Sequence, residues 1–206
     1  MTEKDFDEAY ARAENGDFFS IDISDEGSLK DDFGQLAGVL IQFGTGGYAH
    51  IGYVREKDID MSVEAIDKGT VPTNIVKAYR GKSSVGITFW RLKDMTPEKL
   101  KIMNDTCDTI VGQKHPYAWG NVLRLGGRAL LCKIPLLGWF INKFVWKIPY
   151  IGDDGKDLFC SEVATIIARS ADKEFRKDYQ PNEVTPTMFC ESSHLIQVSR
   201  AVGSKP

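Results

Sequence analysis

Cys160, His50 and Glu64 supply the three side-chain types that cooperate in covalent catalysis: a thiol, an imidazole and a carboxylate. A thiolate attacks a carbonyl carbon. An imidazole takes the thiol proton and returns it to the leaving group, while a carboxylate holds the imidazolium in place. The chain has four cysteines and three histidines in 206 residues. His115 and His194 lie in turn-like contexts, which makes His50 the best candidate for the base.

Cys160 stands where a loop runs into a predicted helix over 160–171. Counting from Cys160, the apolar residues Val163, Ala164 and Ile167 follow at the spacing of one helical face. Cys160 is therefore the first residue on the apolar face of that helix. The positive end of a helix dipole lowers the pKa of a thiol in the first turn. Cysteine is also among the most buried residue types, and by position alone core packing is the favoured interpretation.

The orienting acid would be Glu64. Predicted strands cover residues 49–54, which include His50, and residues 61–66, which include Glu64. Apolar residues flank Glu64 on both sides, so its side chain points away from theirs. If the two strands pair antiparallel, Glu64 reaches the second ring nitrogen of His50. The alternative interpretation is a solvent-facing acid beside a structural histidine.

Stabilisation of a developing oxyanion needs donors near the thiol. The backbone amide of Cys160, at the start of the helix, is a natural one. Tyr117, Tyr48 and Ser161 are further candidates for oxyanion or substrate binding, and the sequence does not choose between them.

The elements that must position these residues indicate a single α+β domain over residues 1–206, because strands come early and helices late. Strands are predicted over 18–23, 49–54, 61–66, 85–92 and 195–202, and helices over 4–14, from Thr96-Pro97, over 118–131, over 160–171 and after Thr185-Pro186. Residues 36–43 are apolar and fit either a strand or a short helix.

The composition of the chain limits the kinds of molecule that it is expected to bind. Hydrophobic residues make up 42% and charged residues 27%, which is ordinary for a soluble globular chain. The net charge of −3 and the dispersed lysines and arginines give no reason to expect a nucleic-acid partner. No cofactor or metal is expected, because the glycine-rich loop 44–47, the acidic loop 152–157 and the cysteines lack phosphate-loop, calcium-loop and zinc spacings.

The N-terminal residues lack a basic segment and an apolar segment, so no secretory signal is predicted. We therefore expect synthesis in a reducing cytoplasm and free thiols, with a non-classical route if the protein acts in the periplasm or in a target cell.

The apolar stretch 129–151 contains three lysines and two prolines, which disfavours a transmembrane helix. It is predicted as a core helix or a lid over the active site. The alternative is a segment that contacts a membrane surface through its aromatic residues and lysines.

The order of these motifs resembles that of the circularly permuted papain-like hydrolases of the NlpC superfamily, the YiiX-like group related to lecithin–retinol acyltransferase. The matching elements are Gly16-Asp17, Ala49-His50-Ile51-Gly52, Val63-Glu64-Ala65, Gly112–Tyr117, Phe159-Cys160-Ser161-Glu162 and Thr185-Pro186. The match spans about residues 16–195. It implies a permuted papain-like fold, in which an antiparallel sheet packs against helices and the nucleophile lies at a helix N-terminus.

The resemblance implies a thiol peptidase or amidase with Cys160, His50 and Glu64 as its triad. Its substrate would be an amide bond in peptidoglycan stem peptides, cleaved through a thioester acyl-enzyme. A lipid acyl hydrolase or acyltransferase is one alternative, and a non-catalytic binding module with Cys160 in its core is another. Without a signal, a cell-wall enzyme would fit a toxin or phage protein, with delivery machinery or an immunity protein as partner.

Overall fold

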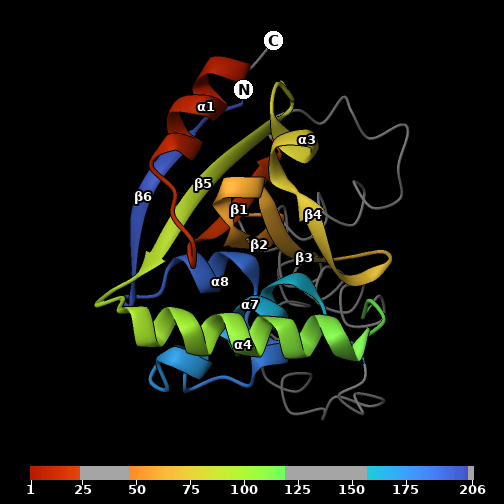
Figure 1. Cartoon of the computed structure of the whole chain (residues 1–206), viewed down its shortest axis with the longest axis vertical. Coiled ribbons are helices and arrows are strands. Elements are labelled where there is room, and N and C mark those ends of the chain that lie inside the picture. The colour runs from red at the N-terminus through yellow and green to blue at the C-terminus, as the bar shows by residue number, and fades with distance from the viewer. Residues whose placement is uncertain (24–46, 119–156, 204–206) are drawn as a thin grey trace, which may run out of the picture.

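The computed structural model describes residues 1–23, 47–118 and 157–203, which form a six-stranded antiparallel sheet with helices on both faces (Figure 1). The fold class is therefore α+β, as predicted. The strands are β1 (Phe18–Ile23), β2 (His50–Glu56), β3 (Met61–Ile66), β4 (Gly69–Asn74), β5 (Val85–Leu92) and β6 (Leu195–Ala201), in the spatial order β4-β3-β2-β1-β5-β6.

Two helical layers cover the two faces of the sheet. On one face lie α4 (Pro97–Gln113), α7 (Cys160–Ala171) and α8 (Pro186–Cys190), and on the other lie α1 (Glu3–Ala11) and α3 (Ile75–Tyr79) (Figure 1). Single 3₁₀ turns, η2 (Lys57–Ile59) and η4 (Pro181–Glu183), connect elements.

Side chains along each strand point alternately to the two faces of the sheet and so pack into two separate hydrophobic cores. Phe18 and Ile51 belong to the core under α4 and α7, whereas Phe19 and Val54 belong to the core under α1 and α3. Each such fully buried apolar side chain contributes roughly 1.5–3 kcal/mol to the free energy of unfolding. The sheet is thus anchored on both faces, which fixes the strand ends that carry the candidate site.

The structure confirms several predicted elements. The strands at 18–23, 61–66 and 85–92 and the helix at 160–171 have the predicted bounds. The helix predicted from Thr96-Pro97 is α4, and the Thr96 hydroxyl caps it by accepting from the Lys99 amide at 3.2 Å.

Other expectations differ from the structure or lie outside it. The helix predicted over 4–14 ends at Ala11, and β4 and α3 were not predicted. β4 contains Pro72, which is tolerated because β4 is an edge strand of the sheet. The predictions for 36–43, for 118–131 beyond its first residue and for 129–151 fall outside the described residues.

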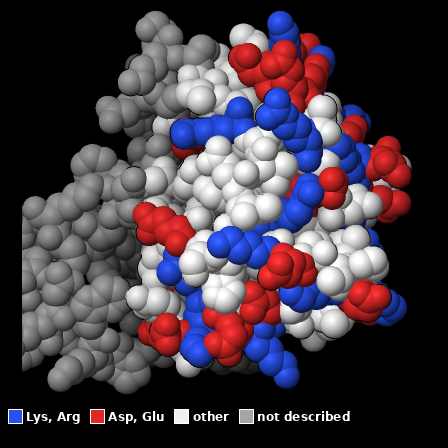
Figure 2. Space-filling view, turned by 90° about the vertical axis from the view of Figure 1, so that its left-hand side faces the viewer, with Lys and Arg blue, Asp and Glu red and all other residues white. Residues whose placement is uncertain are grey.

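Acidic and basic side chains are interspersed on the face of the molecule shown in Figure 2. Among the helices of residues 1–23, 47–118 and 157–203, none is long and apolar enough to cross a membrane.

Candidate active site

The thiol of Cys160 lies where β2 and β3 separate. The two strands pair as far as the cross-strand pair Gly52 and Glu64. Beyond it β2 continues to pair with β1, through Ile51 and His50, and β3 continues to pair with β4. The helix α7 begins at Cys160 and packs on both strands. The thiol accepts a hydrogen bond from the backbone amide of Ile51 and interacts with the side chain of His50. The opening between two strands is therefore filled by the start of a helix.

His50 and Glu64 form a direct contact, with His50 Nε2 lying 2.8 Å from Glu64 Oε2. The contact follows from strand register, because His50 lies two residues before Gly52, on the same face of the sheet and diagonally across from Glu64. The expectation that Glu64 reaches an imidazole nitrogen is met.

Gly52 makes this contact sterically feasible. A Cβ atom at Gly52 would lie 2.9 Å from Cγ of Glu64 and 2.2 Å from the Phe19 ring. Since both close neighbours are buried, packed side chains, any larger residue would have to displace Glu64 or Phe19 at a cost in stability.

Glu64 is a buried carboxylate with a full set of donors. Its side chain is 2% exposed. Besides His50, its oxygens accept hydrogen bonds from the hydroxyls of Tyr79 at 2.5 Å, Ser62 at 3.2 Å, and Thr73. Burial alone raises the pKa of Glu64, but the hydrogen bonds and the charge of His50 outweigh it and hold that pKa below its ordinary value. Glu64 is therefore an ionised, immobile partner for the imidazole.

Glu64 occupies Nε2 of His50, which leaves Nδ1 for Cys160. The His50 side chain keeps 18% of its surface exposed, so the ring is reachable from solvent. Burial lowers the pKa of His50, but the hydrogen bonds and negative charges of Cys160 and Glu64 raise it to about 10.

The pKa of the Cys160 thiol shifts in the opposite direction. Burial raises it, but the His50 charge and hydrogen bond, together with the amides of Ile51 and Ser161, lower it below its ordinary value. A lowered thiol pKa beside a raised imidazole pKa favours a thiolate–imidazolium pair.

The other described cysteines show how unusual this thiol is. Cys107, Cys160 and Cys190 are all free and buried, which agrees with the expectation of free thiols; Cys132 lies outside the described residues. Burial raises the pKa of Cys107 to about 12 and that of Cys190 further still. Burial alone therefore cannot account for the behaviour of Cys160, and the imidazole beside it is the difference.

Among the candidate auxiliary residues, Tyr117 lies near the thiol. The segment around Tyr117 forms a bridge with Leu158, through hydrogen bonds of 3.0 Å from the Leu158 amide to the Pro116 carbonyl and 3.1 Å from the Ala118 amide to the Leu158 carbonyl. Burial and the negative charge of Cys160 raise the pKa of Tyr117. The Tyr117 phenol therefore stays protonated and lies within electrostatic range of the thiol.

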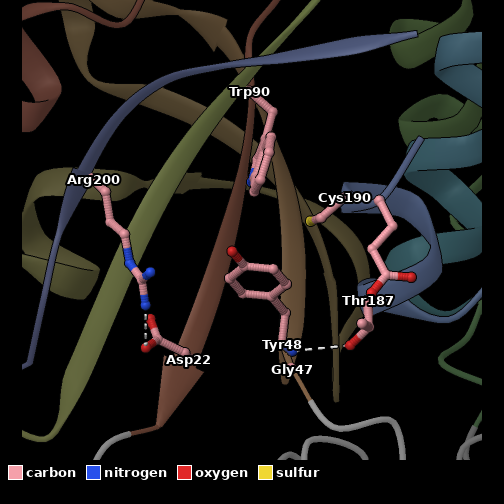
Figure 3. Close-up of a pocket in the computed structure, with 8 residues that line it drawn as sticks. Asp22, Gly47, Tyr48, Trp90, Thr187, Cys190 and Arg200 are labelled. Carbon is pink, nitrogen blue, oxygen red and sulfur yellow. Dashed lines mark hydrogen bonds and ion pairs between the residues drawn. The ribbon is translucent and has the colours of Figure 1, made fainter. Parts of the chain in front are cut away.

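Ser161 and Tyr48 have other surroundings. The Ser161 hydroxyl is fully buried and donates to the Val184 carbonyl at 2.6 Å, so that only the Ser161 amide borders the thiol. Tyr48 lines a different cavity, where its ring packs edge-on against Trp90 (Figure 3). The hydroxyl of Ser161 and the ring of Tyr48 are thus engaged away from Cys160.

Tyr79, Thr73 and Ser62 were missed by sequence reasoning. Ser62 precedes Glu64 by two residues in β3, so alternation could have placed it on the same face. Thr73 and Tyr79 belong to β4 and α3, which were not predicted.

No cluster of three or more potential metal-ligating side chains occurs within the part of the chain that the structure describes. Comparison of the chain with protein-family models, with curated proteins and with solved structures found no match.

Proposed function

We propose that this protein is a cysteine hydrolase that cleaves amide bonds in peptidoglycan stem peptides. Cys160 is the nucleophile, His50 the general base and acid, and Glu64 the residue that orients His50. The observation that carries the proposal is one imidazole that contacts Glu64 through Nε2 and also interacts with the Cys160 thiol, with pKa shifts that favour the ion pair.

In the acylation step the Cys160 thiolate adds to the amide carbonyl carbon and its oxygen becomes an oxyanion. The imidazolium of His50 gives its Nδ1 proton to the amide nitrogen, the carbon–nitrogen bond breaks, and the amine leaves. In deacylation His50 takes a proton from water, the hydroxide adds to the thioester, and the thiolate leaves with the carboxylic acid as product. Glu64 stays ionised throughout and stabilises the imidazolium.

Two donors are suited to the oxyanion. The first is the backbone amide of Cys160, because α7 starts at this residue and its N-cap, Phe159, makes no side-chain cap hydrogen bond. The second is the Tyr117 hydroxyl, which is held near the thiol and stays protonated because its pKa is raised.

The same geometry supports a permuted papain-like fold. The base His50 precedes the nucleophile Cys160 in the chain, and the antiparallel strand of the base packs beside the helix of the thiol. A triad is recognised by geometry, so chain order is free to change.

Incubation of the purified protein with peptidoglycan and with phospholipid vesicles tests the proposal. The expected products are muropeptides with new amino and carboxyl ends, formed by the parent protein and absent with Cys160→Ala. Release of fatty acids instead would assign the site to lipid acyl hydrolysis. If neither substrate yields a product that requires Cys160, the site belongs to a binding module and the proposal fails.

A further inference from the structure

A cavity of about 350 Å³ lies at the end of the sheet where β1 ends and β2 begins, the same end that carries His50 (Figure 3). Its walls come from strands on one side and the α8 region on the other, and include Asp22, Tyr48, Trp90, Thr187, Cys190, Glu191 and Arg200. It contains opposite charges and two aromatic rings, which is the composition of a polar ligand site rather than of a packing defect.

The ion pair in this cavity is built differently from the other arginine–aspartate pairs of the described residues. Three pairs are closed forks with two contacts each, between 2.7 and 3.0 Å: Arg55–Asp108, Arg80–Asp7 and Arg91–Asp17. Arg200 and Asp22 share one contact of 3.4 Å. Because charge-assisted hydrogen bonds are normally about 2.7–2.9 Å long, the Arg200–Asp22 pair is open.

Both partners of the open pair keep unused hydrogen-bonding capacity. The Arg200 side chain is 43% exposed, so its guanidinium has donors available to a ligand. Asp22 Oδ1 accepts no hydrogen bond. It lies against Gly86, the residue opposite Asp22 in β5, where a Cβ atom would approach Oδ1 to 2.2 Å. Oδ1 is therefore shielded from solvent by the glycine, and the exposed 17% of the Asp22 side chain lies elsewhere, so a ligand would approach Oδ2, the oxygen that contacts Arg200.

The aromatic side of the cavity is held in place. Trp90 Nε1 donates to the Ser20 hydroxyl at 2.8 Å, and the rings of Tyr48 and Trp90 meet edge-to-face with centroids 5.9 Å apart. The Tyr48 amide donates to the Thr187 hydroxyl at 3.1 Å, which ties this wall to α8 (Figure 3). A fixed apolar surface thus adjoins the charged pair.

We propose that this cavity binds an unblocked α-amino-acid unit, with its carboxylate on Arg200, its ammonium group on Asp22 and its aliphatic part against Trp90 and Tyr48. A ligand carrying both charges on one carbon can insert into the open pair and satisfy both partners. The volume is at the lower end of the roughly 300–1,000 Å³ of ligand cavities, which favours an amino acid over a lipid chain. The inference rests on the proposed function, because the cavity is assigned as a subsite for a side-chain amino-acid centre of the peptide substrate, such as the free end of meso-diaminopimelate, which keeps both charges on one carbon.

Isothermal titration calorimetry on the Cys160→Ala protein tests the subsite without catalysis. The probes are D-alanine and meso-diaminopimelate, and the blocked controls are N-acetyl-D-alanine and D-alaninamide. We expect the free amino acids to bind and each blocked form to bind about tenfold more weakly or worse, since one charge-assisted contact is lost. Asp22→Asn and Arg200→Gln should weaken binding similarly, whereas Arg80→Gln, which opens an exposed fork elsewhere, should not.

Absence of binding, or equal binding of free and blocked forms, overturns the inference, as does preferential binding to phosphatidylethanolamine vesicles. Thermal unfolding of each variant shows that the fold is retained. An active hydrolase that binds no probe would refute the subsite and leave the function intact. Probe binding by a protein that cleaves no peptidoglycan amide would refute the proposed function and leave the cavity as an amino-acid site without a role in peptide cleavage.

Discussion

The hydroxyl of Tyr79 donates to the same oxygen of Glu64 that contacts His50, over a distance of 2.5 Å. Tyr79 comes from α3, a helix that has no other connection to the chemistry, and its pKa is raised by burial and by the charge of Glu64, so that it remains a donor. A buried carboxylate is thereby kept ionised and fixed in direction. Tyr79 acts through Glu64 and is a positioning residue.

Replacing Tyr79 by phenylalanine should keep the ring, which packs edge-on against Phe19, and remove the donor. We expect kcat/KM to fall about tenfold, since a hydrogen bond to a charged group is worth roughly 1.5–3 kcal/mol. Loss of a bond to the ionised form raises the pKa of Glu64. In the parent the acid limb of the pH–rate profile is set by loss of the Cys160 thiolate; in the variant, protonation of Glu64 should add to this loss and move the limb to higher pH. A fall in activity without movement of that limb would contradict the positioning role.

Gly52→Ala should lower both stability and activity. The added Cβ atom would overlap the Phe19 ring and press on Glu64, and overpacking of this kind costs about 1–3 kcal/mol. Gly112→Ala is the matched control, because it lies in α4 with no atom within 4 Å of the new Cβ. Urea denaturation should show a lower free energy of unfolding for Gly52→Ala and a value up to about 1 kcal/mol higher for Gly112→Ala. Equal effects of the two changes would argue against a tight fit at Gly52.

Tyr117→Phe should lower kcat by roughly tenfold to a hundredfold with little change in KM, if its hydroxyl donates to the oxyanion only in the transition state. Tyr179→Phe serves as the control in the same assay, because Tyr179 is an exposed tyrosine that belongs to neither proposed site. The assignment of Tyr117 would be refuted by a kcat equal to that of the parent.

The pH profile of kcat/KM should be bell-shaped, with its acid limb set by the pKa of Cys160 and its basic limb set by the pKa of His50. The thiolate is lost as pH falls through the lowered pKa of Cys160, and the imidazolium is lost as pH rises through about 10, the pKa of His50. Because the charge of Glu64 contributes to that raised value, Glu64→Gln should move the basic limb to lower pH. Measurement of kcat/KM against pH for both proteins checks this, and an unmoved basic limb would mean that Glu64 does not act on His50.

Local sequence patterns predicted the parts of the site that depend on regular elements. The spacing of Val163, Ala164 and Ile167 predicted α7 and so placed Cys160 at its start. Period-two alternation around Glu64 predicted which way its carboxylate points, and register with β2 then brought it to His50. Each of these inferences required only neighbours along one chain segment.

The other residues of the site could not be placed from the sequence, because they lie in segments whose local sequence patterns are weak and their positions depend on contacts between segments. Thr73 and Tyr79 come from β4 and α3, which are too short for periodicity and, in β4, interrupted by a proline. Tyr48 was one of the candidates for oxyanion or substrate binding. It precedes β2, where strand alternation no longer governs direction, and its amide is bound to Thr187 of α8. Tertiary contacts set the direction of such residues.

Ultraviolet titration of the thiolate tests the pairing of Cys160 with His50 most directly, since it requires neither substrate nor access of a reagent. Difference spectra between the parent and Cys160→Ala should show one thiolate at neutral pH that disappears on acidification. Cys107 and Cys190 should stay silent, because burial raises the pKa of both. In His50→Ala the neutral-pH thiolate should be absent. A Cys160 thiolate that forms only above about 8.5, the ordinary thiol pKa, in the parent and in His50→Ala alike, would contradict the account.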